Sequence, residues 1–251
     1  MTTAFEFEDR AVAFIDVLGF RSLVQGAAAD RKLLEQLADL VDLLAQAVPA
    51  QNRKVSRDVA PHLIPRHIYV SDCIILSAPL SDAGRTNYDG LEIVVMRAIQ
   101  LTHYFLRQGY LIRGGIAVGK VWHSDSNIVG PAYQEAYCLE HTGSEPMVLL
   151  SASAAARCRP GSRMCIRKDG KTFVNGLHDY YIPNNDVHGE IERTYGGYAG
   201  LAAERLAADL QSSAHAKWLW FKEYLAAESS DELRWPGAAD IPTSPVQDPS
   251  D

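Results

Sequence analysis

The residues Ala13-Phe14-Ile15-Asp16-Val17-Leu18-Gly19-Phe20 decide the fold. The apolar run from Ala11 to Ile15 predicts a buried strand, which stops at the carboxylate of Asp16. Gly19 predicts a tight turn before a helix. A carboxylate at this point suits a divalent cation, and the N–H groups near a helix N-terminus suit phosphates. The stretch therefore indicates nucleotide chemistry, for which we expect a second carboxylate elsewhere in the chain.

The composition limits the classes of function. The chain has 251 residues, 47% of them hydrophobic, which suffices for one large domain with an accessory element. A formal net charge of -7 argues against a nucleic-acid partner. No apolar run predicts a membrane span, and the first ten residues do not resemble a signal peptide. The four cysteines lack zinc spacing, so we expect reduced thiols and a cytoplasmic protein.

Apolar periodicity and turn residues predict the remaining elements. The helix after Gly19 is interrupted near 26–29, and Asp30 is expected to begin a second helix that Pro49 ends. The further expectations are strands at 62–70 and 73–78, a helix at 91–108, and a hairpin of 111–118 and 120–123 that turns at Gly119. They continue with a helix from 131 to about 141, a strand at 147–150, a helix at 153–157, a hairpin of 163–167 and 171–174, and a strand at 178–182.

The order β α β β α β β α indicates an α+β fold with a mixed or antiparallel sheet and packed helices. Residues 1–183 are expected to form the main domain and residues 184–235 a C-terminal helical extension. In that extension, Trp218 and Trp220 place apolar area that either docks on the same chain or forms a dimer contact. Residues 236–251 are rich in Pro, Ser and Asp and are expected to be a disordered tail.

Asp72 is the candidate for the second carboxylate. It lies where two apolar strands meet, after Tyr69-Val70 and before Cys73-Ile74. One interpretation is a simple turn residue, since Asp is common in turns. The other is a metal ligand beside Asp16, because paired carboxylates hold two divalent cations on a triphosphate. Spacing alone leaves both interpretations open.

Four segments, in the same order, resemble motifs of the class III nucleotidyl cyclases. Residues 14–20 resemble the F-x-D-x-x-G-F signature, and residues 69–73 resemble the second metal motif, which is usually Gly-Asp in a hairpin. Residues 113–119 resemble an Arg-x-Gly-Ile-x-x-Gly strand, and residues 130–136 resemble the start of the last catalytic helix. The resemblance implies a cyclase catalytic domain at 1–183. It also implies a homodimer with composite active sites, each built from both subunits.

Three positions depart from the family pattern. Gln134 and Cys138 stand where the family has Asn and, four residues on, Arg. Gln can still donate a hydrogen bond, whereas Cys cannot replace a cation. Ile68 stands four residues before Asp72, where adenylate cyclases carry Lys and guanylate cyclases carry Glu. An apolar side chain cannot read the edge of a purine.

The short, single-domain bacterial cyclases of the Pycsar anti-phage systems tolerate these departures. This chain resembles them in size and in the Gly130-Pro131-Ala132 start of the last helix. That resemblance implies conversion of UTP, or next CTP, into a cyclic monophosphate and pyrophosphate. The cyclic nucleotide would then activate a separate effector after infection. Two alternatives stay open: an adenylate or guanylate cyclase with an unusual base pocket, and an inactive cyclase-like module that binds a nucleotide.

The resemblance also implies roles for individual residues. Asp16 and Asp72, with the Val17 carbonyl, would hold two Mn²⁺ or Mg²⁺ ions in each active site. The N–H groups of Leu18, Gly19 and Phe20 would bind the phosphates, and Gly19 leaves room for them. Arg113 would supply the cation that the last helix lacks, although a structural ion pair is an equal interpretation.

Four further residues are expected to contact the substrate, and for two of them, Lys171 and Tyr69, a structural interpretation is at least as strong. Gln134 would donate a hydrogen bond to the reacting groups. Arg66 would contact the base or the phosphates, and Lys171 would contact the triphosphate unless it is only a solvated hairpin tip. Tyr69 would stack on a small base, although a half-buried Tyr is more often a core residue.

Overall fold

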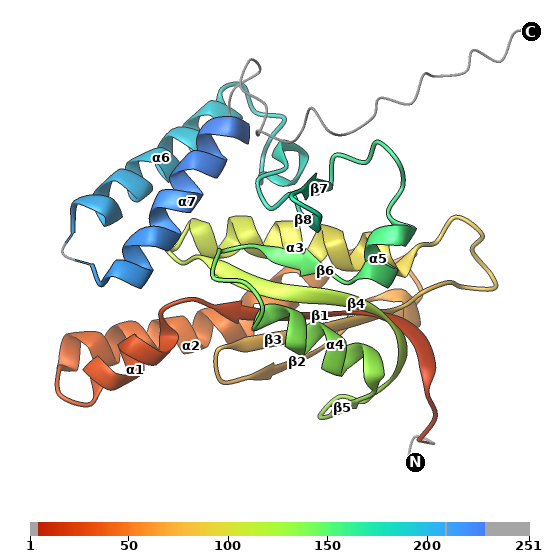
Figure 1. The fold of residues 1–251 in the computed structure, drawn as a ribbon. Coiled ribbons are helices and arrows are strands. Elements are labelled where there is room, and N and C mark those ends of the chain that lie inside the picture. Colours follow the sequence, from red (N-terminus) through yellow and green to blue (C-terminus); the bar gives the residue numbers. More distant parts are fainter. Residues whose placement is uncertain (1–4, 209, 229–251) are drawn as a thin grey trace, which may run out of the picture.

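The computed structural model describes residues 5–208 and 210–228. Its centre is an eight-stranded sheet in the order β2-β3-β1-β4-β6-β8-β7, with β5 paired to β4 off this path (Figure 1). The β4–β6 pair is parallel and the other pairs are antiparallel. The expected α+β class with a mixed sheet is therefore confirmed.

The helix after Gly19 ends at Ala27 and a second helix begins after Asp30, as expected. The strands are β1 (Glu8–Val17), β2 (Arg66–Val70), β3 (Cys73–Pro79), β4 (Ile112–His123), β5 (Ile128–Val129), β6 (Val148–Leu150), β7 (Cys165–Lys168) and β8 (Lys171–Val174). The α-helices of the described residues are α1 (Phe20–Ala27), α2 (Arg31–Asn52), α3 (Gly90–Leu106), α4 (Pro131–Glu140), α5 (Ala152–Arg157), α6 (Glu190–Ala207) and α7 (Ser212–Glu228). Short 3-10 turns lie at Pro61–Leu63 and Asp179–Tyr181.

Strand β1 organises the sheet because it pairs with β3 on one side and β4 on the other. The register places Asp16 opposite Cys73 of β3 and opposite Arg113 of β4. Successive residues of a strand point to opposite faces. Phe14 therefore packs toward α4, and Ile15 packs toward the opposite face with α2 and α3. Asp16 shares the α4 face with Phe14.

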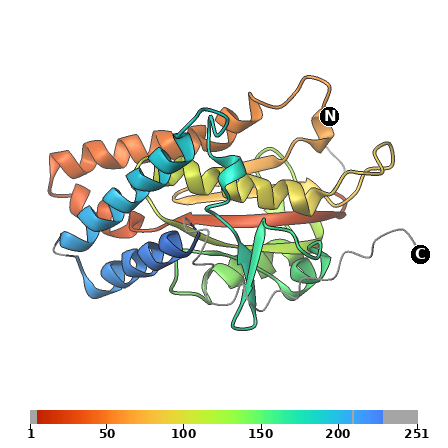
Figure 2. The same cartoon turned by 90° about the horizontal axis from the view of Figure 1, so that it is seen from above.

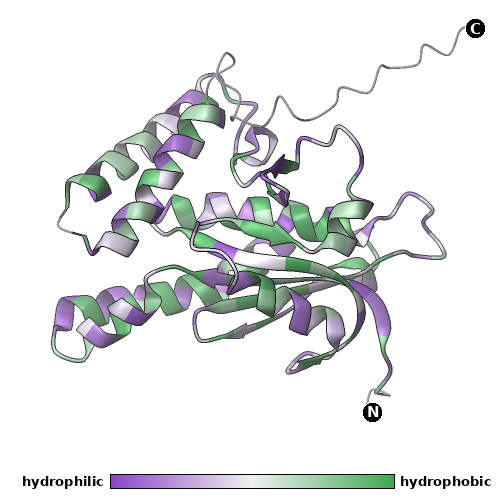
Figure 3. Ribbon diagram, in the orientation of Figure 1, coloured by the Kyte–Doolittle hydropathy of each residue, from purple (hydrophilic) through white to green (hydrophobic). Residues whose placement is uncertain are grey.

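Two apolar layers hold the sheet. The larger cluster joins β1, β3 and β4 to the buried sides of α2 and α3, and a smaller one lies beneath α4. Figure 3 shows hydrophobic and hydrophilic residues alternating along the outer helices, as expected for helices with one side toward the sheet. Burial of this apolar area is the main stabilising contribution to the fold. Within the described residues, no helix is both long and apolar enough to cross a membrane.

The strand-turn-helix unit around Gly19 forms as its sequence predicts. Gly19 has φ +91, in the left-handed region that glycine adopts most easily, and α1 begins at the next residue. Asp30 begins α2 as an N-cap, since its side chain accepts hydrogen bonds from the N–H groups of Lys32 (2.8 Å) and Leu33 (3.4 Å). The turn at Gly19 and the start of α2 are thus set by residues that are neighbours in the chain.

The hairpin expected at Gly119 is wrong. Strand β4 continues through this glycine, which has φ +151, and pairs with β1 from Glu8 to Val17. A turn at Gly119 would leave the first residues of β1 without a partner on this side. The chain turns later, between β4 and β5, where the Ser124 hydroxyl accepts a hydrogen bond from the Asn127 N–H (3.0 Å).

Two other local expectations are also wrong. Helix α2 does not end at Pro49 but continues to Asn52. Ala47, Val48 and Gln51 are buried there, so packing outweighs the hydrogen bond that proline removes. The strand expected at 178–182 is instead a 3-10 turn, Asp179–Tyr181, that no neighbouring strand pairs with in the described residues.

The C-terminal helices α6 and α7 pack on the rest of the same chain (Figure 1). Trp218 and Phe221 are 8% and 2% exposed, and they belong to a cluster that includes Leu106, Leu149 and Phe173. Docking on the same chain is therefore observed for the tryptophan-bearing end. The tail expected to be disordered, 236–251, lies outside the described residues, as do residues 229–235.

Candidate active site

Asp16 and Asp72 meet at one end of the sheet, as the second interpretation of Asp72 requires. Asp16 is the last residue but one of β1, and Asp72 follows Ser71 in the two-residue turn between β2 and β3. The Val17 N–H donates to the Asp72 carbonyl (3.2 Å), which fixes the turn against β1. The side-chain ligand atoms of Asp16, Asp72 and Cys73 lie within 4.8 Å of one another.

The electrostatics of this pair favour a bound cation. Burial first, and then the adjacent Asp72 carboxylate, raise the pKa of Asp16 to about 7. Arg113 acts in the opposite direction but does not cancel these effects. Two carboxylates forced together in a partly buried place repel one another, and a divalent cation between them removes this cost.

The donor set fits Mn²⁺ or Mg²⁺ better than a softer metal. The carboxylate oxygens of Asp16 and Asp72 are hard ligands of the kind these ions prefer. The Cys73 Sγ lies 3.6 Å from Asp72 Oδ1 and 3.9 Å from Asp16 Oδ1. Burial and the two carboxylates raise the pKa of Cys73 well above its usual range, so it remains a thiol. Cys73 therefore donates toward the carboxylates and is not a thiolate ligand.

Arg113 and Glu140 complete the cluster from β4 and α4. Arg113 Nε lies 3.3 Å from Asp16 Oδ2 and 2.5 Å from Glu140 Oε1. The Glu140 side chain is 2% exposed, and its other oxygen lies 2.6 Å from His141 Nδ1. Both interpretations of Arg113 thus have support, since it forms a structural ion pair and also lies directly against a candidate metal ligand.

The helix N-terminus at Gly19 offers part of the expected phosphate site. The Leu18 N–H donates to the Leu111 carbonyl (2.9 Å), so this group of the expected three is already used within the chain. Among the described residues, the N–H groups of Gly19 and Phe20 have no backbone partner. A Cβ atom at Gly19 would meet nothing within 4 Å, so the approach to these N–H groups is open.

The structure does not bring Arg66 or Lys171 to the carboxylates within one chain. Arg66 pairs with Ser77 at the far end of β2 and donates to the His123 carbonyl. Ser77 in turn lies opposite Val12, about 13 Å along β1 from Asp16. Lys171 lies at the tip of the β7–β8 hairpin. Strands β4 and β6 lie between β1 and β8, so Lys171 is about 14 Å across the sheet from β1.

Among the described residues, Gln134 and Tyr69 form no hydrogen bond with the carboxylates, although burial and the charge of Asp72 raise the pKa of Tyr69. Gln134 is exposed on α4, one helical turn before the likewise exposed Cys138. Tyr69 packs on the α2 and α3 face of the sheet, whereas Ile68 packs on the α4 face that carries Asp16. The roles given to Gln134, Tyr69, Arg66 and Lys171 therefore stay predictions that one chain alone does not test.

Three residues near the site were missed in the sequence. Glu140 could have been found, because Ala132, Ala136 and Glu140 recur at four-residue steps on the buried side of α4. Arg21 is exposed in the first turn of α1, next to the open N–H groups. Cys73 had no signal beyond its position next to Asp72.

Comparison with known proteins gives structural matches only. No family profile matches the chain, and no curated protein matches its sequence. The adenylyl cyclase CyaB from P. aeruginosa matches with a TM-score of 0.46 and 17% identity, covering 67% of this chain and 94% of that one. The catalytic core of a rhodopsin-guanylyl cyclase with converted specificity, solved with ATPalphaS, matches with a TM-score of 0.44 and 17% identity over 67% and 96% of the two chains. The adenylate/guanylate cyclase/hydrolase from Silicibacter pomeroyi matches with a TM-score of 0.38 and 15% identity over 67% and 96%.

Proposed function

We propose that this protein is a metal-dependent nucleotidyl cyclase that acts on a pyrimidine nucleoside triphosphate, UTP before CTP. The observation that carries the proposal is the pairing of Asp16 and Asp72 beside a helix N-terminus with open N–H groups. A cyclase must hold a triphosphate while the ribose 3′-oxygen attacks the α-phosphorus and pyrophosphate leaves. Carboxylates for cations and N–H groups for phosphates are the two devices that this reaction needs.

Each residue of the site has a defined task in this proposal. Asp16 and Asp72, with the Val17 carbonyl, would hold Mn²⁺ or Mg²⁺, which supplies Lewis-acid stabilisation of the phosphate charge. Gly19 and Phe20 bind phosphate oxygens through their N–H groups, and Arg21 adds a positive charge at the same place. Arg113 is oriented by Asp16 and Glu140 through its Nε atom, which leaves its terminal nitrogens to face the substrate.

The preference for a pyrimidine is based on Ile68. This side chain packs with the apolar cluster beneath α4, next to Cys73 and Tyr133 on the same face as Asp16. It offers no hydrogen bond to the edge of a base. A smaller base loses less from such a contact than a purine, whose recognition requires donors and acceptors along its edge.

A second copy of the chain would complete the active site. Gln134 and Lys171 lie away from Asp16 in one chain, so their proposed roles require a partner subunit. Val70 and Tyr137, on the α4 side of the sheet, are 56% and 44% exposed. Large apolar side chains exposed around a site of this kind favour a subunit interface.

The competing proposal is a cyclase-like module that binds a nucleotide without converting it. The observation that favours it is Cys138, which is exposed on α4 and offers no positive charge. The buried pair of carboxylates argues against it, because a binding module gains nothing from two groups that repel one another.

Product analysis distinguishes these proposals. Purified protein with Mn²⁺ is incubated with ATP, GTP, CTP and UTP separately, and the products are separated by mass. We expect cyclic UMP, and less cyclic CMP, from the wild type and none from an Asp16→Ala, Asp72→Ala variant. Asp39→Ala, an exposed carboxylate on α2, is the matched control and should keep full activity. A cyclic purine product would overturn the pyrimidine preference, and no product at all would favour the binding module.

We further propose that the cyclic nucleotide serves as a signal in anti-phage defence and acts on a separate effector. The support is the resemblance to the Pycsar cyclases in size and at Gly130-Pro131-Ala132, and the fact that this branch tolerates the departures at Ile68, Gln134 and Cys138. The test is to measure cyclic UMP and cyclic CMP in cells that express the chain, before and after phage infection. A level that stays constant through infection, with no protection of the cells, would contradict this role.

A further inference from the structure

A cleft lies on the face of the sheet opposite Asp16. It is formed by the C-terminal end of α2, the outer side of α3 and residues 180–185, and its volume is about 760 Å³. Figure 2 shows the segment between β8 and α6 crossing above α3 beside the end of α2. This volume is within the range of sites for small ligands. The cleft is separated from the carboxylates by the sheet itself.

The charge of the cleft is positive, although the chain carries a net charge of -7. Lys54, Arg97 and Arg107 line it, and no Asp or Glu does. Arg107 forms an ion pair with Glu190 at 3.3 Å. Arg97 has only neutral side-chain partners, Gln100 Oε1 at 3.0 Å and Asn52 Oδ1 at 3.1 Å. Two positive charges, on Lys54 and Arg97, are therefore without a carboxylate partner in the described part of the chain.

The burial of Arg97 is the observation that points to a ligand. Its residue is 4% exposed, and its Nε atom has no hydrogen-bond partner. Beside it, Gln51 is 9% exposed, and neither polar atom of its amide has a partner. A buried arginine without a counter-ion and a buried amide without partners are both costly. An anion in the cleft would compensate the charge of Arg97 and accept a hydrogen bond from the Gln51 amide nitrogen.

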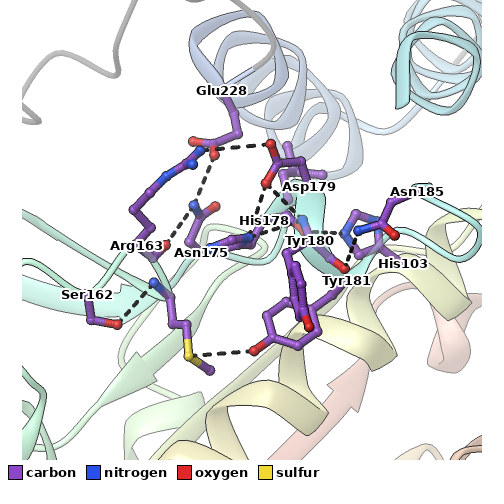
Figure 4. Close-up of polar contacts among 12 residues, drawn as sticks. His103, Ser162, Arg163, Asn175, His178, Asp179, Tyr180, Tyr181, Asn185 and Glu228 are labelled. Carbon is purple, nitrogen blue, oxygen red and sulfur yellow. Dashed lines mark hydrogen bonds and ion pairs between the residues drawn. The ribbon is translucent and has the colours of Figure 1, made fainter. Parts of the chain in front are cut away.

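Aromatic side chains also line the cleft, from α3 and from the segment at 180–185. Tyr104 of α3 is half-buried, and Tyr180 is 70% exposed at the rim. Figure 4 shows how the segment that carries Tyr180 is held: Asn185 donates to the Tyr180 carbonyl (2.7 Å), and the Tyr181 hydroxyl donates to Met164 Sδ (3.7 Å). His103 also binds the His178 carbonyl (3.2 Å) through Nε2. Tyrosine rings that line a cleft suit the flat face of a base.

We propose that this cleft is a second ligand site, which binds a nucleotide with its phosphate against Arg97 and Lys54 and its base against Tyr104 and Tyr180. The unpaired amide of Gln51 contacts the phosphate or the ribose. The site does not depend on the reaction at Asp16 and Asp72, since it shares no residue with them. Its ligand is a nucleotide without a metal, because no carboxylate lines the cleft.

The test is calorimetric titration with UMP, AMP and inorganic phosphate in the presence of EDTA, which keeps cations from Asp16 and Asp72. We expect at least one of the two nucleotides to bind, and more tightly than phosphate. Arg97→Met should weaken this binding about tenfold or more, since it removes a charge-assisted hydrogen bond. Lys54→Ala should weaken it less. Arg97→Met should fold at least as stably as the wild type, because removing a buried charge without a carboxylate partner offsets the loss of its hydrogen bonds to Gln100 and Asn52.

Matched variants separate this site from the carboxylates. Lys32→Ala removes an exposed lysine from the other end of α2 and should leave the affinity unchanged. The Asp16→Ala, Asp72→Ala variant should also bind as the wild type does. If neither nucleotide binds, or if Lys54→Ala and Arg97→Met bind as the wild type does, the proposal is overturned. Phosphate that binds as tightly as the nucleotides would overturn the part assigned to the base.

Discussion

Arg113 Nε lies between two carboxylates, 2.5 Å from Glu140 and 3.3 Å from Asp16. This contact joins the last turn of α4 to the end of β1, at the point where the second carboxylate also lies. Glu140 is almost fully buried, so its charge depends on Arg113 and His141 for compensation. The orientation of Arg113 toward Asp16 therefore depends on a residue of α4.

We predict that Glu140→Gln lowers both stability and turnover. The variant keeps the shape of the side chain but removes the charge that holds Arg113, which should cost about 1–3 kcal/mol of unfolding free energy. Urea unfolding and initial rates with UTP and Mn²⁺ measure the two effects. Glu135→Gln, on the exposed side of the same helix, is the control and should change neither quantity. Equal behaviour of the two variants would show that Glu140 does not position Arg113.

The metal-free protein should lose stability as pH rises. The pKa of Asp16 is raised to about 7, whereas the unfolded chain releases this proton near its ordinary value of about 4. Between these values the folded state binds more protons, so the free energy of unfolding falls as pH increases. Unfolding with EDTA at about pH 5 and about pH 8 should show a loss on the order of 2–4 kcal/mol that Asp16→Asn lacks. Added Mn²⁺ should restore more stability at the higher pH, and identical pH profiles for the two proteins would contradict this.

Replacement of Gly19 by any other residue should lower both the stability of the fold and the affinity for the substrate. Its φ of +91 costs alanine about 1 kcal/mol, and a side chain here would also stand at the approach to the phosphates. Gly19→Ala should therefore raise the KM for UTP as well as lower stability. Gly200→Ala is the matched control, because this glycine lies within α6 with nothing within 4 Å of its Cβ position. It should gain about 0.5–1 kcal/mol and keep its activity. A Gly19→Ala enzyme with unchanged KM would argue against the phosphate site.

Mixing two inactive variants tests whether each active site uses two chains. Asp16→Ala and Gln134→Ala should each be inactive alone. In a mixed dimer one site carries both substitutions and the other carries neither, so an equal mixture should regain about a quarter of wild-type activity. The measurement is the rate of cyclic product after the variants have been refolded together. A mixture that stays inactive, while light scattering shows dimers, would place the whole site within one chain.

The parts of the fold predicted from the sequence are those set by neighbours in the chain. Gly19 needs its left-handed conformation and Asp30 caps the helix that follows it, whatever packs around them. The strand that ends near Asp16 and the turn at Asp72 were predicted for the same reason. The pairing of the two carboxylates then follows from the β1–β3 register, which the sequence alone left open.

The parts that could not be predicted depend on contacts between distant segments. A glycine at position 119 favours a turn when only its neighbours in the sequence are considered. Pairing along the whole length of β1 instead keeps β4 extended through Gly119. Glu140 and Arg113 are far apart in the chain, so their ion pair appears only once α4 packs over β4. Arg66 was expected to contact the base or the phosphates, yet it lies at the end of β2 that is farther from Asp72.

The most direct test of the central claim is a competition between substrates. Wild-type protein and the Asp72→Asn variant are each given Mn²⁺ and equal amounts of ATP, GTP, CTP and UTP, and the four cyclic monophosphates are quantified by mass spectrometry. The wild type should produce mainly cyclic UMP, with cyclic CMP next, and the variant should produce none. No cyclic nucleotide from the wild type, or an undiminished yield from Asp72→Asn, would contradict the claim that Asp16 and Asp72 form the metal site of a cyclase.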